Sequence, residues 1–228
     1  MSIFNQLVSL WKSKDLLSQA WDESLEMINL SNTMFISAIK YLKKGEKSKK
    51  IKRLKKTDQE INEFQKSVRK KVVTHFSISK NLEELPSGLV LLSIVVDVER
   101  LGDYTKNILD LAIHYPGKLI SEELLTELND IETEVISMFE KTIKAIENKD
   151  ERAAKELLST YKKSFASVSD QIVNNSISGN QTFQTQNQAA AVTLYSRYLK
   201  RVGAHLKNIV TTVVNPYEYI GFKTPKQL

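Results

Sequence analysis

The stretch VVDVERLGDYTKNILDLA, residues 95–112, decides the fold. Its apolar residues are dense enough to predict a buried helix. Yet Glu99, Asp103 and Asn107 follow one another at intervals of four residues, so they lie on one face of that helix, one turn apart. Two buried carboxylates this close need a positive charge between them, from a Lys, an Arg or a metal ion. Gly102 suits a position where another backbone approaches closely, and it is equally compatible with no special role.

The composition of the 228 residues is that of a globular protein, with 41% hydrophobic and 26% charged residues. This length suffices for one large domain or two small ones. Seven Gly and four Pro favour long helices with few turns. The absence of Cys excludes disulfides, thiolate metal ligands and a Cys nucleophile. No apolar run reaches the roughly 20 residues of a membrane span, and no secretion signal is recognisable, so we expect a cytoplasmic protein.

The net charge of +6 is concentrated in one segment, from Lys40 to Lys56. This basic segment holds ten Lys or Arg and one acidic residue, a net charge of +9, so the rest of the chain is mildly acidic at −3. A solvated helix end explains such a segment, and so does contact with an acidic protein surface or an anionic membrane. Tyr41 is its one aromatic residue that could stack on a base, so we expect no specific nucleic-acid binding.

Apolar residues recur at steps of three and four along most of the chain, which predicts long amphipathic helices. Gly45 suits the end of the first long helix, and Ser121 suits the N-cap of the fourth. The seam of the second helix is interrupted by Asp58, which needs a partner if it is buried. We expect a tail that is loose after Tyr219. The predicted helices are an amphipathic lead-in at 2–14 and six longer ones at 16–44, 47–76, 87–114, 121–148, 150–175 and 183–214.

The second half of the chain repeats the first. AIKYLKKGE, from Ala38, matches TIKAIENKDE, from Thr142, at an offset of 104 residues. ERLGDYTKNI, from Glu99, matches KRVGAHLKNI, from Lys200, at an offset of 101 residues. A three-helix unit used twice is the simplest explanation. We therefore predict an all-α protein of two tandem three-helix bundles packed side by side, at 16–117 and 118–217, with a lead-in at 1–15 and a tail at 218–228.

Two such bundles with an acidic motif on the third helix resemble the PhoU family of phosphate-regulation proteins. The family signature is close to ERIGD followed by Asn, and it stands here as ERLGD at residues 99–103 with Asn107. The resemblance extends from about Leu17 to Pro216. It implies a cytoplasmic, often dimeric protein that restrains phosphate uptake through contact with the phosphate transporter and its sensor histidine kinase. Some members bind iron, zinc or other metals through carboxylates of E/DxxxD motifs.

The second repeat departs from this motif at its acidic positions. Glu99 corresponds to Lys200, and Asp103 to Ala204. At the offset of 104, Asp58 corresponds to Lys162. The resemblance therefore implies at most one metal site, for Fe, Zn, Mn or Ni, in the first bundle and no carboxylate cluster in the second. The ligands of that site would be Glu99, Asp103, Asp58 and Asn107, with Asp97 and Asn62 as lesser candidates.

A purely structural role for the same carboxylates stays open beside metal binding. In that interpretation Glu99 and Asp103 form salt bridges with Arg100, Lys106 or a lysine of the other bundle. The matching functions are a regulator of phosphate uptake and signalling with one metal site, and a structural or transporter-associated adaptor that has lost metal binding.

A ferritin-like metal-binding protein is a third class. Such proteins use Glu-x-x-His pairs, and no Glu stands three residues before His75, His114 or His205. The sequence also lacks a Gly-rich phosphate loop, a nucleophile elbow and an HExxH motif. We therefore expect a protein without enzymatic activity.

Overall fold

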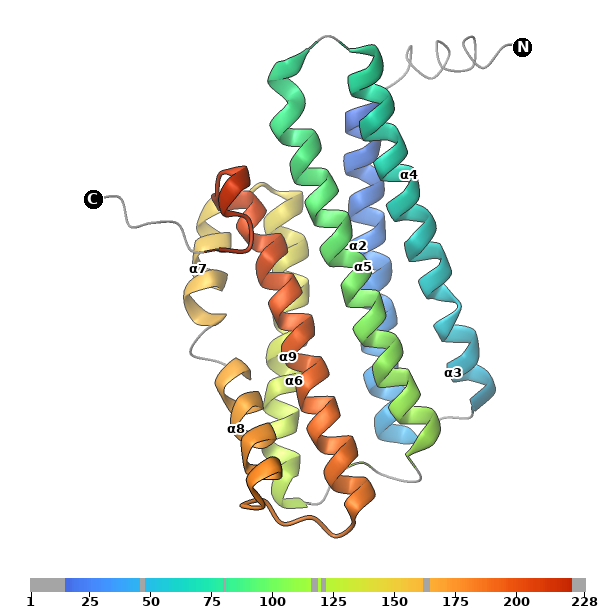
Figure 1. The fold of residues 1–228 in the computed structure, drawn as a ribbon, viewed down its shortest axis with the longest axis vertical. Coiled ribbons are helices and arrows are strands. Elements are labelled where there is room, and N and C mark those ends of the chain that lie inside the picture. Colours follow the sequence, from blue (N-terminus) through green and yellow to red (C-terminus); the bar gives the residue numbers. More distant parts are fainter. Residues whose placement is uncertain are drawn as a thin grey trace.

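The structure is a computed structural model, and it describes residues 15–45, 48–79, 81–115, 119, 122–161 and 165–222. Every regular element in these ranges is a helix, so the all-α prediction is confirmed. The longer helices run along the long axis of the molecule (Figure 1). In chain order the elements are α2 (Leu16–Lys44), α3 (Ser48–Lys55), α4 (Thr57–Ile78), the 3-10 turn η1 (Leu82–Glu84), α5 (Leu85–His114), α6 (Glu122–Glu147), α7 (Glu151–Tyr161), α8 (Phe165–Ser178), α9 (Gln186–Val214) and the 3-10 turn η2 (Tyr217–Tyr219).

The helices form two bundles that lie side by side (Figure 1). In the first bundle α2, α4 and α5 contact one another, and in the second α6, α7 and α8 each contact α9. The bundles meet mainly where α5 packs against α9, with a smaller contact between α2 and α6. Each half of the chain thus builds its own bundle, as the internal repeat predicts. Across the described ranges, no helix has the length and apolar character needed to cross a membrane.

Helix α5 is enclosed on three sides, by α2, α4 and α9. Its buried side chains are therefore not confined to one narrow stripe and include Leu91, Val95, Val98, Leu101 and Ile108. Burial of a side chain of this size stabilises the fold by about 1.5–3 kcal/mol. The dense apolar sequence around ERLGD is explained by this enclosed position.

The ends of α2 follow from its flanking residues. Asp15 Oδ1 accepts a hydrogen bond from the Leu17 backbone N–H at 3.3 Å, which caps the helix N-terminus. Gly45 adopts the left-handed conformation, with a φ of 65°, and its N–H donates to the Tyr41 carbonyl at 3.1 Å. The predicted helix at 16–44 and its predicted end at Gly45 are confirmed. Helices α5, α6 and α9 also begin and end within three residues of their predicted bounds.

Two helices that were predicted as continuous are each divided in the structure. The predicted helix at 47–76 becomes α3 and α4, because the Lys56 N–H bonds to the Arg53 carbonyl, three residues back, at 3.1 Å. The predicted helix at 150–175 becomes α7 and α8, which contact α9 as separate segments. Residues 162–164 between them lie outside the described ranges. Neither break contains the Gly or Pro that would have signalled it.

The expected loose tail is corrected as far as Phe222. The Asn215 side-chain amide donates to the Tyr219 carbonyl at 2.9 Å and to the Phe222 carbonyl at 3.0 Å. The Gly221 N–H donates to Thr211 Oγ1 at 2.7 Å. These bonds fold residues 215–222 back onto the end of α9. The predicted lead-in helix at 2–14, the predicted N-cap Ser121 and the residues after 222 lie outside the described ranges.

Candidate functional site

Asp58 is the buried centre of the predicted acidic site. It lies in the first turn of α4, is 5% exposed and faces α5. Its Oδ2 accepts hydrogen bonds from Lys106 Nζ at 2.8 Å and from Asn62 Nδ2 at 3.2 Å. Its Oδ1 is buried without a hydrogen-bond partner. A methyl group on Gly102 would lie 3.1 Å from that oxygen, so this glycine accommodates the close approach of side chains from α4.

Lys106 lies between Asp58 and Asp103 and supplies the positive charge that the motif requires. Its ammonium is 2.8 Å from a carboxylate oxygen of each. Arg100 Nη1 adds a third contact, at 2.8 Å from Asp103 Oδ2. Burial alone would raise the pKa of Asp103, but the hydrogen bonds and charges of Lys106 and Arg100 outweigh it and lower that pKa. Burial likewise opposes the charge of Lys106, yet its two carboxylate partners raise its pKa.

Glu99 is the least compensated carboxylate of this group. Its nearest cation is the Arg100 guanidinium, with Nε at 3.5 Å, and its side chain is 19% exposed. Burial, followed by the charge of Asp103, raises the pKa of Glu99. Three carboxylates and two cations therefore meet on one side of the first bundle. We call this group, Asp58, Glu99, Arg100, Asp103 and Lys106, the ERLGD cluster.

The structure separates the remaining candidate ligands. Asn62 adjoins the ERLGD cluster, because its side-chain amide donates to Asp58. Asn107 lines a shallow polar pocket of about 480 Å³ together with Asp103 and Lys106. Asp97 is outside the cluster: it faces the second bundle, where its Oδ1 contacts His205 Nδ1 at 2.7 Å. The chemistry of the ERLGD cluster suits a metal ion, but the Lys106 ammonium takes the position between Asp58 and Asp103.

The equivalent position in the second bundle carries the opposite charge. Lys200, which corresponds to Glu99, forms a short ion pair with Asp170 of α8. Arg197 lies 3.7 Å from the same carboxylate. Both repeats thus place an ion pair between the third helix and a helix packed against it, with the cation on the third helix in each case. Lys162, the predicted counterpart of Asp58, lies outside the described ranges.

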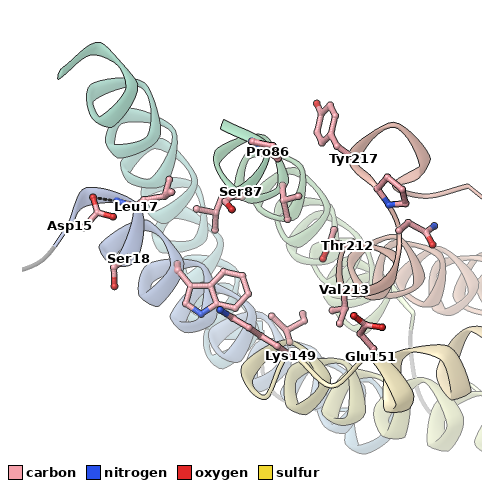
Figure 2. A pocket seen from close by; sticks show the side chains of 16 residues that line it. Asp15, Leu17, Ser18, Pro86, Ser87, Lys149, Glu151, Thr212, Val213 and Tyr217 are labelled. Carbon is pink, nitrogen blue, oxygen red and sulfur yellow. Dashed lines mark hydrogen bonds between the residues drawn. The ribbon is translucent and has the colours of Figure 1, made fainter. Parts of the chain in front are cut away.

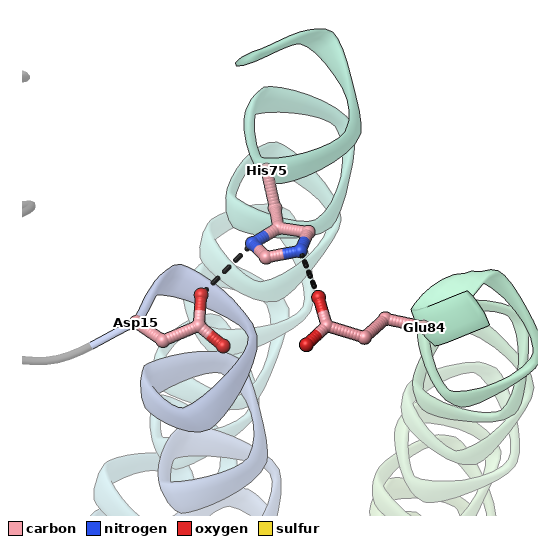
Figure 3. A group of neighbouring side chains, drawn as sticks. All are labelled: Asp15, His75 and Glu84. Atoms are coloured by element: carbon pink, nitrogen blue, oxygen red, sulfur yellow. Dashed lines mark hydrogen bonds and ion pairs between the residues drawn. The ribbon is translucent and has the colours of Figure 1, made fainter. Parts of the chain in front are cut away.

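Two polar clusters were missed by the sequence analysis. Buried Glu132 of α6 pairs with Lys43 of α2 and accepts a hydrogen bond from the fully buried Tyr195 hydroxyl at 2.7 Å. At the far end of the first bundle, His75 lies between the carboxylates of Asp15 and Glu84 (Figure 3). Asp15 lies 60 residues before His75, and Glu84 lies nine residues after it beyond a helix end, so no helical spacing relates the three. The sequence offered one indication: each of these three residues is of a type that binds metals, and each lies near a predicted helix end.

A groove of about 640 Å³ opens between the two bundles near the start of α2 (Figure 2). Its apolar wall includes Leu17, Trp21, Val90 and Val213. Lys149 lies over the Trp21 ring, with the ammonium 5.8 Å from the ring centre. The groove therefore joins surfaces from both repeats.

Comparison with known proteins identifies the family. Among solved structures, PhoU from Pseudomonas aeruginosa is similar over 87% of this chain and 95% of its own, with a TM-score of 0.73 at 18% identity. The phosphate transport system regulatory protein PhoU from Streptococcus pneumoniae is similar over 87% of this chain and 93% of its own, with a TM-score of 0.69 at 17% identity. No curated protein matches the chain. The family model for the PhoU domain matches twice, over residues 25–112 and 128–213, one match in each bundle, and the chain therefore belongs to the PhoU family.

Proposed function

We propose that this protein is a cytoplasmic, non-enzymatic regulator of phosphate uptake and phosphate signalling. It acts by contact with a phosphate transporter, a sensor histidine kinase or both. The observation that carries this proposal is the pair of PhoU-domain matches, which together span both bundles. The solved structure from Streptococcus pneumoniae, described as a phosphate transport system regulatory protein, supports the same role through its shared fold. A homodimer is part of the same proposal.

The basic segment from Lys40 to Lys56 is the surface that we assign to partner contact. It covers the end of α2 and the whole of α3, at the tip of the first bundle. Lys49, Lys52 and Arg53 are exposed there. Concentrated positive charge of this kind favours an acidic protein surface or the anionic membrane face beside a transporter.

A metal ion at the ERLGD cluster remains a prediction. Binding at Asp58, Glu99, Asp103 and Asn107 would require the Lys106 ammonium to move away from two carboxylates that it contacts at 2.8 Å. The second candidate function, an adaptor that has lost metal binding, is favoured by this same contact. In the adaptor, Lys106 permanently supplies the charge that a metal would otherwise bring.

Affinity capture from cells grown with and without phosphate tests the proposal. We expect a phosphate permease subunit or a histidine kinase among the captured proteins, in amounts that depend on phosphate. Replacing Lys49, Lys52 and Arg53 by Glu should weaken that capture. The matched control replaces the same number of exposed cations on α4, which are Lys66, Arg69 and Lys70. Capture of neither partner would favour the adaptor. Equal capture by both triple variants would show that the basic segment does not contribute to partner binding.

A further inference from the structure

Asp15, His75 and Glu84 bring metal-ligand side chains together from three elements at one end of the first bundle. Asp15 is the N-cap of α2, His75 lies in the last turn of α4, and Glu84 ends η1, directly before α5. His75 Nδ1 is 2.9 Å from Asp15 Oδ1, and Nε2 is 2.8 Å from Glu84 Oε2. Figure 3 shows the imidazole ring between the two carboxylates. In the described ranges this is the group of His and acidic side chains whose ligand atoms all lie within 4.8 Å of one another.

We propose that these three residues bind a divalent transition-metal ion of the Zn²⁺ type. One imidazole nitrogen and two carboxylates are a common three-ligand set for such an ion, with the remaining position left to water. Zn²⁺ bonds of about 2.0–2.2 Å place ligand atoms roughly 3.4 Å apart in a tetrahedral site. The ion therefore takes one ring nitrogen and draws both carboxylates to that side of the imidazole. This site goes beyond the proposed regulatory function and does not depend on it.

The exposure of the three side chains suits such a closure. His75 is 8% exposed, and the edge of the Phe76 ring packs against it at 4.9 Å between ring centres. The imidazole is therefore a fixed ligand. Asp15 and Glu84 are 47% and 39% exposed, so an ion can reach their carboxylates from solvent.

The charge balance also favours a divalent ion. A protonated imidazole between two carboxylates leaves a net charge of −1, whereas a divalent ion with neutral imidazole leaves none. The C-terminal end of α4 favours a cation here, whereas the N-terminal ends of α2 and α5, whose N-cap residues are Asp15 and Glu84, oppose one, so the preference comes from the side-chain charges. Asp15 has a second role at this place, since it borders the groove between the bundles (Figure 2). An ion held here fixes the start of α2, the end of α4 and the start of α5 to one another.

Titration of the full chain with Zn²⁺ alone, after chelator treatment and in phosphate-free buffer, tests the proposal. Calorimetry should report a site on each chain, and Zn²⁺ should raise the melting temperature. Glu84→Gln and His75→Gln should each weaken binding by about tenfold or more. His114→Gln is the matched control, because His114 is exposed at the end of α5 and should leave binding unchanged.

The Glu84→Gln variant keeps the experiment decisive even if His75→Gln perturbs folding. Glu84 is partly exposed, and Gln has nearly the same volume, so this substitution should leave the fold intact. Absence of Zn²⁺ binding would overturn the proposal. Binding that survives Glu84→Gln at full strength would overturn it as well. In those cases the cluster is a histidine held between two carboxylates. Failure of partner capture, in contrast, would contradict only the regulatory function.

Discussion

Replacing Lys106 by Met tests whether the ERLGD cluster is held together by this ammonium. The substitution leaves Asp58, which is 5% exposed, with the Asn62 amide and no cation. Removing one partner of a buried ion pair typically costs about 3–5 kcal/mol. The Lys106 side chain is 29% exposed, so water reaches this pair and reduces the loss. We therefore expect the free energy of unfolding to fall by about 2–3 kcal/mol at pH 7.

Urea denaturation followed by circular dichroism measures this loss. Lys55→Met is the matched control, because Lys55 pairs with Asp110 at 2.5 Å while the two side chains are 31% and 45% exposed. That exposed pair should contribute less than about 1 kcal/mol. Adding Asp58→Asn to Lys106→Met should recover much of the stability, since it removes the uncompensated charge. The reasoning is refuted if Lys106→Met costs no more than Lys55→Met, or if the double variant is no more stable than the single one.

The advantage of the native protein over Lys106→Met should depend on pH in a defined direction. The pKa of Asp103 is lowered, so its contribution is present above its ordinary value of 3.8 and is lost as the pH falls through the lowered value. The pKa of Lys106 is raised, so its contribution is present below its ordinary value of 10.5 and is lost as the pH rises through the raised value. Stability measured between those limits should show a constant difference, which shrinks in acid and in strong base.

Three further substitutions have outcomes that follow from the structure. Glu99→Gln should raise the melting temperature at pH 7, because burial and then the charge of a neighbouring carboxylate raise the pKa of Glu99, and the gain should vanish below its ordinary pKa of 4.5. Tyr195→Phe should cost about 1.5–3 kcal/mol in urea denaturation, since it removes a 2.7 Å hydrogen bond to buried Glu132. Gly88→Ala should cost about 1–3 kcal/mol, because its methyl group would lie 2.3 Å from the Phe76 ring, and adding Phe76→Leu should recover part of this in the same assay.

The sequence predicted the helices well because their apolar periodicity is unbroken over many turns. The interruption at Lys56 could not be read in the same way, because a change from i−4 to i−3 hydrogen bonding there leaves that periodicity intact. The ERLGD cluster was predicted as a group, since Glu99 and Asp103 share a helix face and the interrupted seam pointed to Asp58. Lys106 was foreseen only as one of several partners, because ion-pair geometry depends on how the helices are rotated against each other.

Clusters built from residues of different helices could not be predicted from the sequence, for a different reason. Asp15, His75 and Glu84 each lie at a helix end, where the chain direction changes and no periodicity fixes which side chains meet. The same limit applies to Asp97 and His205, which come together only because α5 packs against α9. Periodicity assigns residues to a face, but the packing of faces decides which of them become neighbours.

Lys106 and a metal ion compete for the same carboxylates, so removal of Lys106 is also the sharpest test for metal binding at the ERLGD cluster. A divalent ion would replace the lost charge between Asp58 and Asp103. If the cluster is a metal site, Lys106→Met should bind Zn²⁺ or Mn²⁺ at least about tenfold more tightly than the native chain. The measurement should be made in a His75→Gln variant, so that the proposed site at Asp15, His75 and Glu84 does not contribute to the binding. A chain without Lys106 that still takes up no metal would leave the carboxylates with a structural role alone.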